Sequence, residues 1–254
     1  YPDLDATFEM VRAFAGEGAL AVEIGVPFSD PIADGPDIQR SSEAAVRSGV
    51  GVGDVLALVA RLRADGVTDL PVVLMTYANP VLRYGLPRFA RDARAAGVDG
   101  LILSDLPPDE SPETWAVLDG AGLDTVVLVA PTTPDDRLPR VLERSRGFVY
   151  CLARAGVTGS GGGESGSLPG RVAAIRRRCT LTVAIGFGIA SGEQARSLAG
   201  AADAVVVGAA FIRRITAALA SGGGIAEQPD VTALPARTDR SSDRGAAPYA
   251  SGAA

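Results

Sequence analysis

Two residue types with central roles in enzyme chemistry, histidine and lysine, are absent from this 254-residue sequence, in which all 24 basic residues are arginine. Without lysine the chain cannot form a Schiff base with a carbonyl substrate. Without histidine it has neither an imidazole acid–base group nor histidine ligands for zinc. Any catalysis must therefore use carboxylates, tyrosines, arginines and backbone dipoles, and we expect no metal site.

Cysteine and net positive charge are scarce as well. The two cysteines, Cys151 and Cys179, lack a Cys-x-x-Cys spacing. This pattern indicates small buried thiols in a reducing compartment, and we expect a cytoplasmic protein. The net charge of −6 argues against nucleic-acid binding, because a phosphate backbone needs clustered positive charge. No apolar run has the length of a membrane span, so we expect no membrane partner.

What the sequence does contain is a series of short, nearly continuous apolar runs, spaced at roughly 25 residues. Such runs are typical of parallel strands that are buried on both faces. They predict strands at Leu20–Ile24, Val72–Thr76, Gly100–Ser104, Thr125–Ala130, Phe148–Leu152, Leu181–Ile185 and Ala204–Val207.

Amphipathic segments separate these runs, which produces the βαβ pattern of a parallel sheet. No Gly-x-Gly-x-x-Gly follows the first strand, so an α/β fold of the (β/α)8 TIM-barrel type is favoured over a dinucleotide-binding sheet. Helices are predicted at Phe8–Ala15, Val55–Arg63, Arg88–Ala95, Trp115–Asp119, Leu138–Arg144, Arg171–Arg177 and Gln194–Leu198, with a second helical segment between Ile24 and Val72.

The predicted pattern is one strand short of eight. We expect the missing strand to be the first, because the sequence begins at Tyr1, where a first barrel strand would have ended. A catalytic barrel domain, truncated at its N-terminus, is therefore expected over residues 1–219. After Leu219 the sequence changes to glycine, serine, proline, aspartate and arginine without a period, which predicts a disordered tail over residues 220–254.

The stretch 19–40 carries the most unusual chemistry. Glu23 stands among apolar residues of a buried strand, and Asp30 and Asp34 follow in a loop rich in proline and glycine. An ionised carboxylate away from water needs a partner or a shifted pKa. Taken alone, Glu23 could simply lean out of the strand end, but the two neighbouring carboxylates favour a functional site.

Polar groups also follow other predicted strands. Tyr77 comes directly after the second strand, Ser104 and Asp105 end the third, and Tyr150 lies near the end of the fifth. Each of these alone is more often a tolerated strand-end residue. In a barrel, however, the active site lies on the loops at the carboxyl ends of the strands. Together the residues predict a site on that rim.

Glycine-rich turns follow the last two strands, at Gly186–Gly188 and Gly208–Ala210. Glycine lets backbone N–H groups approach a ligand, and the helix after Gly208 directs its positive end to the same place. Phosphate sites in many barrels lie at these two loops. The long glycine-rich loop Arg154–Pro169 follows a strand at the same rim, and we expect it to be a lid over the substrate.

Six segments of the sequence carry a specific combination of motifs: Val22–Gln39, Met75–Pro80, Ser104–Pro107, Gly156–Gly159, Gly186–Ile189 and Gly208–Phe211. In this order they resemble the tryptophan synthase alpha subunit family, over roughly residues 1–217. The resemblance implies a lyase that cleaves indole-3-glycerol phosphate to indole and glyceraldehyde 3-phosphate by a retro-aldol step. It implies no cofactor in this chain and a beta-chain partner in an alpha2beta2 complex, which uses pyridoxal phosphate to join indole to serine.

The resemblance also implies roles for individual residues. Glu23 would move protons at indole C3 and at the glycerol hydroxyl, with its carboxyl pKa raised by an apolar environment. Asp34 would accept the indole N–H and stabilise the positive charge that develops on nitrogen. Tyr150 would orient Asp34, and Thr158 would reach Asp34 when the lid closes.

Substrate and partner contacts complete these expectations. Substrate contacts are expected at Tyr77, Thr158, Gly159, Gly186, Gly188, Gly208 and Ala209, with the phosphate held by backbone N–H groups. The beta chain is expected to contact Asp30, Asn79 and Pro107. Ala209 stands where the family more usually has serine, which removes one hydroxyl contact and keeps the backbone donor.

Two other functions fit the same residues. A stand-alone indole-producing lyase would use them without a partner chain. A truncated, inactive paralogue would bind a phosphate ligand or a beta chain without turnover. Other phosphate-binding barrels are disfavoured, because the Pro27–Pro31 stretch does not suit them.

Overall fold

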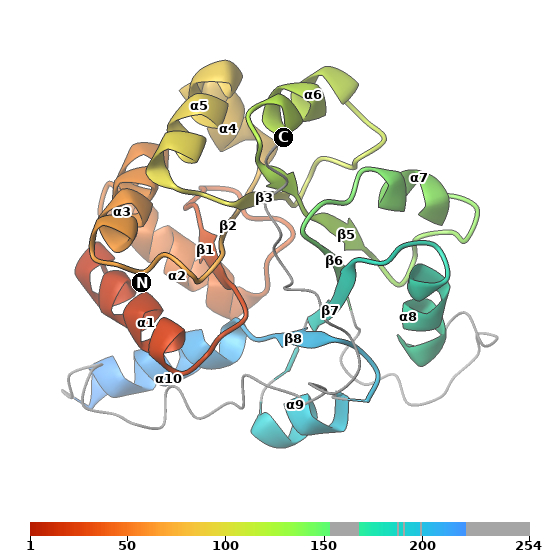
Figure 1. Ribbon diagram of the computed structural model, residues 1–254. Helices are drawn as coiled ribbons and strands as arrows, with labels where there is room; N and C mark the ends of the chain where they lie inside the picture. The colour runs from red at the N-terminus through yellow and green to blue at the C-terminus, as the bar shows by residue number, and fades with distance from the viewer. Residues whose placement is uncertain (153–167, 187, 190, 199, 222–254) are drawn as a thin grey trace.

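A computed structural model describes residues 1–152, 168–186, 188–189, 191–198 and 200–221 of the chain. Parallel strands lie at the centre and helices surround them (Figure 1). The elements follow in the order α1 (Leu4–Gly16), β1 (Val22–Gly25), α2 (Pro36–Arg47), α3 (Val52–Ala64), β2 (Val72–Thr76), α4 (Ala78–Tyr84), α5 (Leu86–Ala96), β3 (Gly100–Leu103), α6 (Pro112–Gly120), β4 (Asp124–Thr125), β5 (Val127–Val129), α7 (Leu138–Glu143), β6 (Phe148–Leu152), α8 (Leu168–Arg176), β7 (Thr182–Gly186), α9 (Gly192–Leu198), β8 (Ala204–Val206) and α10 (Ala209–Ala220).

The strands pair in their sequence order, as a TIM barrel requires. One sheet has the order β1-β2-β3-β4 and the other β5-β6-β7-β8, and every pairing is parallel. Each strand predicted from the apolar runs is present. The run Thr125–Ala130 is divided into β4 and β5, because Val126 belongs to neither ladder. The two helical segments expected between Ile24 and Val72 are α2 and α3.

Strands β1 and β8 are the outer edges of the two sheets, and helices pack against one another beside them. Among the described residues, β1 pairs only with β2 and β8 only with β7. Helix α10 packs against α2, and the ring of Phe211 on α10 meets the ring of Phe14 on α1 edge-on, with centroids 5.0 Å apart. Helices α1 and α10 accordingly lie side by side in Figure 1. The strand expected before Tyr1 stays a prediction.

Successive side chains along β1 and β2 point alternately to the outer helices and to the barrel interior. Val22, Ile24 and Leu74 join the apolar cluster that the outer helices cover, whereas Val73 belongs to the cluster inside the barrel with Tyr150. Side chains of a strand point to opposite faces in turn. Glu23 lies between Val22 and Ile24 and directly beside Val73, so its side chain belongs to the barrel interior.

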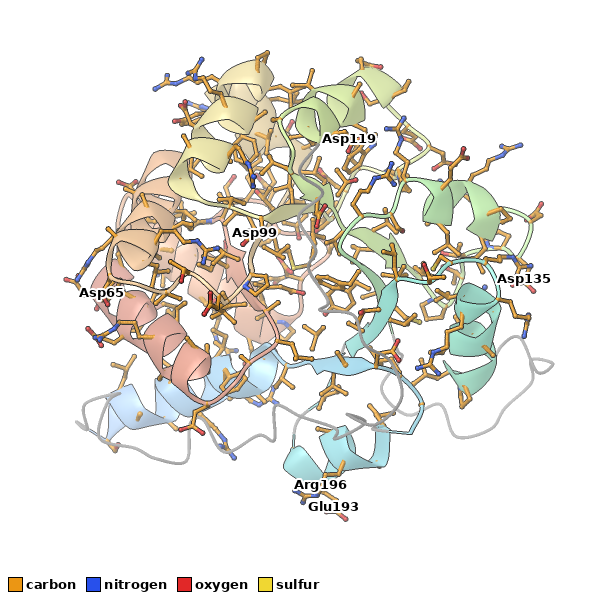
Figure 2. The ribbon with its side chains drawn as sticks, viewed as in Figure 1. Asp65, Asp99, Asp119, Asp135, Glu193 and Arg196 are labelled. Atoms are coloured by element: carbon orange, nitrogen blue, oxygen red, sulfur yellow. The ribbon has the colours of Figure 1, made fainter. Side chains whose placement is uncertain are left out.

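The amino ends of β2 and β3 are joined by Asp99, which lies among the central strands in Figure 2. Its Oδ2 accepts hydrogen bonds from the Val72 backbone N–H at 2.7 Å and from Arg63 Nη2 at 2.6 Å. Arg63 also donates to the backbone carbonyls of Val67, Leu70 and Gly97. This arrangement stabilises the strands at the end opposite to the expected site.

The last described helix, α10, ends at Ala220, one residue beyond the expected domain boundary. Residues 222–254 lie outside the described part, so the tail stays a prediction. Within the described ranges no helix is long and apolar enough to cross a membrane.

Candidate active site

The expected acid–base residues Glu23 and Tyr150 lie inside the barrel, on strands of both sheets. Glu23 comes from β1 and Tyr150 from β6, on opposite sheets. Burial raises the pKa of the Tyr150 hydroxyl, and the charges of Glu23 and of Asp34 raise it further. Tyr150 is therefore close enough to both carboxylates to respond to their charges.

Glu23 is the most perturbed carboxyl of this group. Its Oε1 is shielded from solvent and has no hydrogen-bond partner among the described residues. Burial raises the pKa of Glu23 from the ordinary value of 4.5 to about 7, because the apolar interior disfavours the charged form. A carboxyl with a pKa near neutrality can both donate and accept a proton at physiological pH. An unpartnered buried oxygen is also free to contact a ligand.

Tyr150 occupies its position because residue 186 has no side chain. Gly186 is the last residue of β7, and β7 pairs with β6. A Cβ atom at Gly186 would overlap the hydroxyl and ring atoms of Tyr150. Gly186 was expected to contact the substrate, and the structure shows that it makes room for the tyrosine.

Asp34 lies in the loop between β1 and α2 and is held by Tyr77. The Tyr77 hydroxyl donates to Asp34 Oδ2 at 2.9 Å and accepts from the Ala33 backbone N–H at 3.0 Å. Burial raises the pKa of Asp34 and the Tyr77 hydrogen bond opposes that shift. The expectation was that Tyr150 orients Asp34. No hydrogen bond joins those two within the described residues, and the tyrosine that contacts Asp34 is Tyr77, at Oδ2.

Two residues that support this loop were not singled out from the sequence. Ser42 donates from its hydroxyl to the carbonyl of Phe28 and accepts from the N–H of the same residue, both at 3.0 Å. Gln39 donates to the carbonyl of Asp34 at 2.8 Å. Positions 39 and 42 are three apart and therefore share one face of α2. That spacing, directly after a loop with carboxylates, is a signal that could have identified them.

Glycines line the opposite part of the rim, after β7 and β8. Gly188 has φ +80°, a conformation that L side chains rarely adopt. Gly208 is the N-cap of α10, and Ala209 is the first helical residue. The first N–H groups of a helix have no partners within the helix and attract anions. These positions fit the expected phosphate site, which stays a prediction.

Some expectations cannot be compared with the structure. Thr158 and Gly159, together with most of the predicted lid, lie outside the described residues. Within the described part, no group of three or more Cys, Asp or Glu side chains could hold a metal ion.

The three residues expected to contact a beta chain follow neighbouring strands on the same rim. Asp30 and Asn79 are exposed, and Pro107 is half-buried. The Pro107 carbonyl accepts from Trp115 Nε1 at 3.3 Å, and Asp105 Oδ1 accepts from the Ala78 N–H at 2.7 Å. The loops after β2 and β3 are thus tied to each other and to α6.

Comparison with known proteins identifies the family. A family model described as tryptophan synthase alpha chain matches residues 1–233. The tryptophan synthase alpha chain of Geobacter sulfurreducens is 48% identical over 220 residues, which cover 85% of this chain and 83% of that protein. The alpha chain of Burkholderia multivorans is 44% identical over 238 residues, covering 94% and 88%.

Comparison with solved structures leads to the same family. The tryptophan synthase of M. tuberculosis in its aminoacrylate-bound form superposes with a TM-score of 0.78 at 39% identity, covering 93% of this chain and 86% of that chain. The tryptophan synthase subunit alpha of Legionella pneumophila superposes with a TM-score of 0.77 at 33% identity, covering 91% and 83%. The chain belongs to the tryptophan synthase alpha chain family.

Proposed function

We propose that this chain is a lyase of tryptophan biosynthesis that cleaves indole-3-glycerol phosphate to indole and glyceraldehyde 3-phosphate, as the alpha subunit of tryptophan synthase. The observation that carries the proposal is Glu23, a carboxyl with a pKa of about 7 whose buried oxygen has no partner among the described residues. Membership of the alpha chain family supports the same reaction.

Glu23 can serve both proton transfers of the cleavage. As an acid it adds a proton to indole C3, which makes the ring a cationic iminium. As the resulting carboxylate it removes the proton of the adjacent glycerol hydroxyl. The C–C bond then breaks, its electrons restore the neutral indole, and the hydroxyl carbon becomes the aldehyde of glyceraldehyde 3-phosphate. Glu23 ends protonated, as it began, which suits a pKa near neutrality.

Asp34 would support the charged intermediate. Its carboxylate lies in the same group of residues as Glu23 and Tyr150. By accepting the indole N–H it would stabilise the positive charge that develops on the ring nitrogen. Because indole itself takes up the electrons, this step needs no cofactor in the chain. Pyridoxal phosphate would belong to the beta chain.

The phosphate of the substrate would bind on the glycine side of the rim. The backbone N–H groups of Gly188, Gly208 and Ala209 lie at the ends of β7 and β8, and α10 begins there. The positive end of that helix favours an anion. Gly159 would add a further N–H.

The beta chain would dock on the rim around Asp30, Asn79 and Pro107. Two large apolar side chains are exposed there, Ile32 at 82% and Leu82 at 53%. Exposed apolar groups beside polar ones are typical of protein interfaces. An apolar pocket continues this surface between α4 and α6, lined by Ala78, Val81, Leu82, Leu103, Leu106, Ser111 and Thr114. We place the complex in the cytoplasm, where the unpaired Cys151 and Cys179 would stay reduced.

The activity is tested with Glu23→Gln and Asp34→Asn, each assayed for indole release from indole-3-glycerol phosphate. We expect both to lose at least about 100-fold in kcat, because each removes a charge or proton that the cleavage uses. Binding of glycerol phosphate, measured by calorimetry, should persist. The control is Glu193→Gln on α9, which points away from the barrel in Figure 2. Near-normal turnover in the first two variants would contradict the proposal.

The partner is tested with Ile32→Asp and purified beta chain from a relative. We expect the Kd of the complex to rise at least about tenfold, because a charge would be buried in an apolar contact. Leu20→Asp is the control, since Leu20 is exposed at the amino end of β1, away from this rim. Indole release that never changes on addition of beta chain, with no complex formed, would favour a stand-alone lyase.

A further inference from the structure

The hydroxyl group of Tyr77 makes two hydrogen bonds to consecutive residues of the β1–α2 loop. It accepts from the Ala33 N–H and donates to Asp34 Oδ2. The direction of the second bond follows from the first. A backbone N–H can only donate, so the single hydroxyl proton is available to the carboxylate. Burial and the neighbouring Asp34 raise the pKa of Tyr77, which keeps that proton in place.

Tyr77 is itself held rigidly. It is the N-cap residue of α4, directly after β2, and only 3% of it is exposed. Its ring lies 5.2 Å from the ring of Phe28, which belongs to the same β1–α2 loop. The next residue, Ala78, donates its N–H to Asp105 at 2.7 Å. The Tyr77 hydroxyl is therefore attached to a buried residue at the end of a barrel strand, whereas Asp34 belongs to a loop.

The two carboxylate oxygens of Asp34 differ in their contacts. Oδ2 is taken by Tyr77, and Oδ1 has no hydrogen-bond partner among the described residues. The terminal torsion of an aspartate side chain is broad, so a hydrogen bond at one oxygen narrows the orientation of the whole carboxylate. With Oδ2 fixed, Oδ1 is presented in a constant direction.

We propose that Tyr77 is a positioning residue, which fixes Asp34 through Oδ2 and so directs Oδ1 at the indole N–H. The assignment rests on the proposed function, in which Asp34 accepts that N–H. It differs from a substrate contact in which Tyr77 donates, because the single hydroxyl proton is already donated to Asp34. It also differs from positioning by Tyr150, because the hydrogen bond to Asp34 Oδ2 comes from the Tyr77 hydroxyl.

Tyr77→Phe removes the hydroxyl and keeps the ring contact with Phe28. We expect kcat for indole release to fall about tenfold or more, with KM changed less than about threefold, because a hydrogen bond to a charged group is lost. The acid limb of the kcat–pH profile should move to higher pH, since that hydrogen bond lowers the pKa of Asp34. Tyr84→Phe is the matched control. It removes a 2.9 Å bond between a tyrosine and Asp92, away from the site.

A double-mutant cycle with Asp34→Asn separates positioning from a structural effect. If Tyr77 acts through Asp34, the double variant is no slower than Asp34→Asn alone. A second variant, 3-fluorotyrosine at position 77, keeps ring and hydroxyl and donates more strongly, so the acid limb should move to lower pH. Additive losses, or an unmoved acid limb in both variants, overturn the proposal. If the wild-type chain releases no indole, the proposed function fails instead.

Discussion

The two halves of the barrel have the same hydrogen-bond arrangement at the amino ends of their strands, in which an aspartate makes two bonds to the backbone of a valine. In the first half, Asp99 accepts the Val72 N–H and donates its own N–H to the Val72 carbonyl at 2.9 Å. In the second half, Asp203 makes the same pair of bonds with Val183, at 2.9 and 3.0 Å. In both halves an arginine from the helix before the earlier strand binds the aspartate, here Arg176.

At the carboxyl ends the two halves differ completely. The first half carries acid–base and orienting groups, Glu23, Asp34 and Tyr77. The second half carries glycines, among them Gly188 and Gly208, with Tyr150 reaching across. Similar amino ends and different carboxyl ends show that the scaffold and the chemistry are built on separate sets of residues. Variants at the two ends should therefore have separable effects on stability and on activity.

The largest expected effect is at Glu23, where activity and stability should change in opposite directions. The folded pKa of about 7 lies above the ordinary 4.5, so the folded state binds more protons between these values. Stability then falls as pH rises through that window. Glu23→Gln removes this loss and should be more stable at pH 8 by up to about 3 kcal/mol, while its indole release is abolished. Urea unfolding at pH 5 and 8 tests this, and a stability difference that does not grow with pH would contradict it.

In the wild-type chain the same pKa governs the rate. A cleavage that begins with proton donation by Glu23 should slow about tenfold per pH unit well above pH 7. The measurement is kcat/KM for indole-3-glycerol phosphate from pH 6 to 9. A flat profile over that range would mean that Glu23 is not the acid.

Gly186→Ala should have the next largest effect, in the second half. The new Cβ would overlap Tyr150, so the tyrosine must move, with a stability loss of about 1–3 kcal/mol and a marked fall in kcat. Gly200→Ala is the control, because nothing lies within 4 Å of its Cβ position. Unfolding midpoints and indole release measure the two effects. Equal behaviour of both variants would show that Tyr150 can shift without consequence.

Asp99→Ala and Asp203→Ala test the aspartate–valine arrangement at the amino ends of the strands, and both should affect stability but not activity. Asp99 and Arg63 are more buried, with side chains 32% and 18% exposed against 43% and 40% for Asp203 and Arg176. We expect the free energy of unfolding to fall by about 2–3 kcal/mol in Asp99→Ala and by about 1 kcal/mol in Asp203→Ala, because exposed ion pairs contribute little to stability. Denaturant unfolding measures both. A larger loss of stability in Asp203→Ala than in Asp99→Ala would contradict the view that burial determines the strength of this arrangement in each half.

Gly188→Ala should have the smallest effect on stability. Alanine at φ +80° should lower the free energy of unfolding by about 1 kcal/mol, and displacement of the local N–H groups should raise the Kd of glycerol phosphate several-fold. Gly122→Ala carries the same kind of strain at φ +76°, before β4 and away from the rim. It should lower stability equally and leave ligand binding unchanged. If both variants bind glycerol phosphate equally well, the phosphate site lies elsewhere.

Much of this protein follows from local pattern. Near-continuous apolar runs require strands buried on both faces, which determined the βαβ order and the parallel barrel. Glu23 was identifiable because a carboxylate inside such a run is energetically costly. Glycines after the last two strands indicated a rim where the backbone is accessible.

What the tertiary structure decided is which of these residues touch. The sequence could not show that Tyr77, not Tyr150, holds Asp34, because the two tyrosines are equivalent strand-end residues in the linear pattern. Nor could it show that Gly186 makes room for a ring on the neighbouring strand. Burial and apolar periodicity are properties of single segments and can be inferred along the chain. A hydrogen-bond partner depends on the relative placement of two strands and a loop, and only the folded barrel determines it.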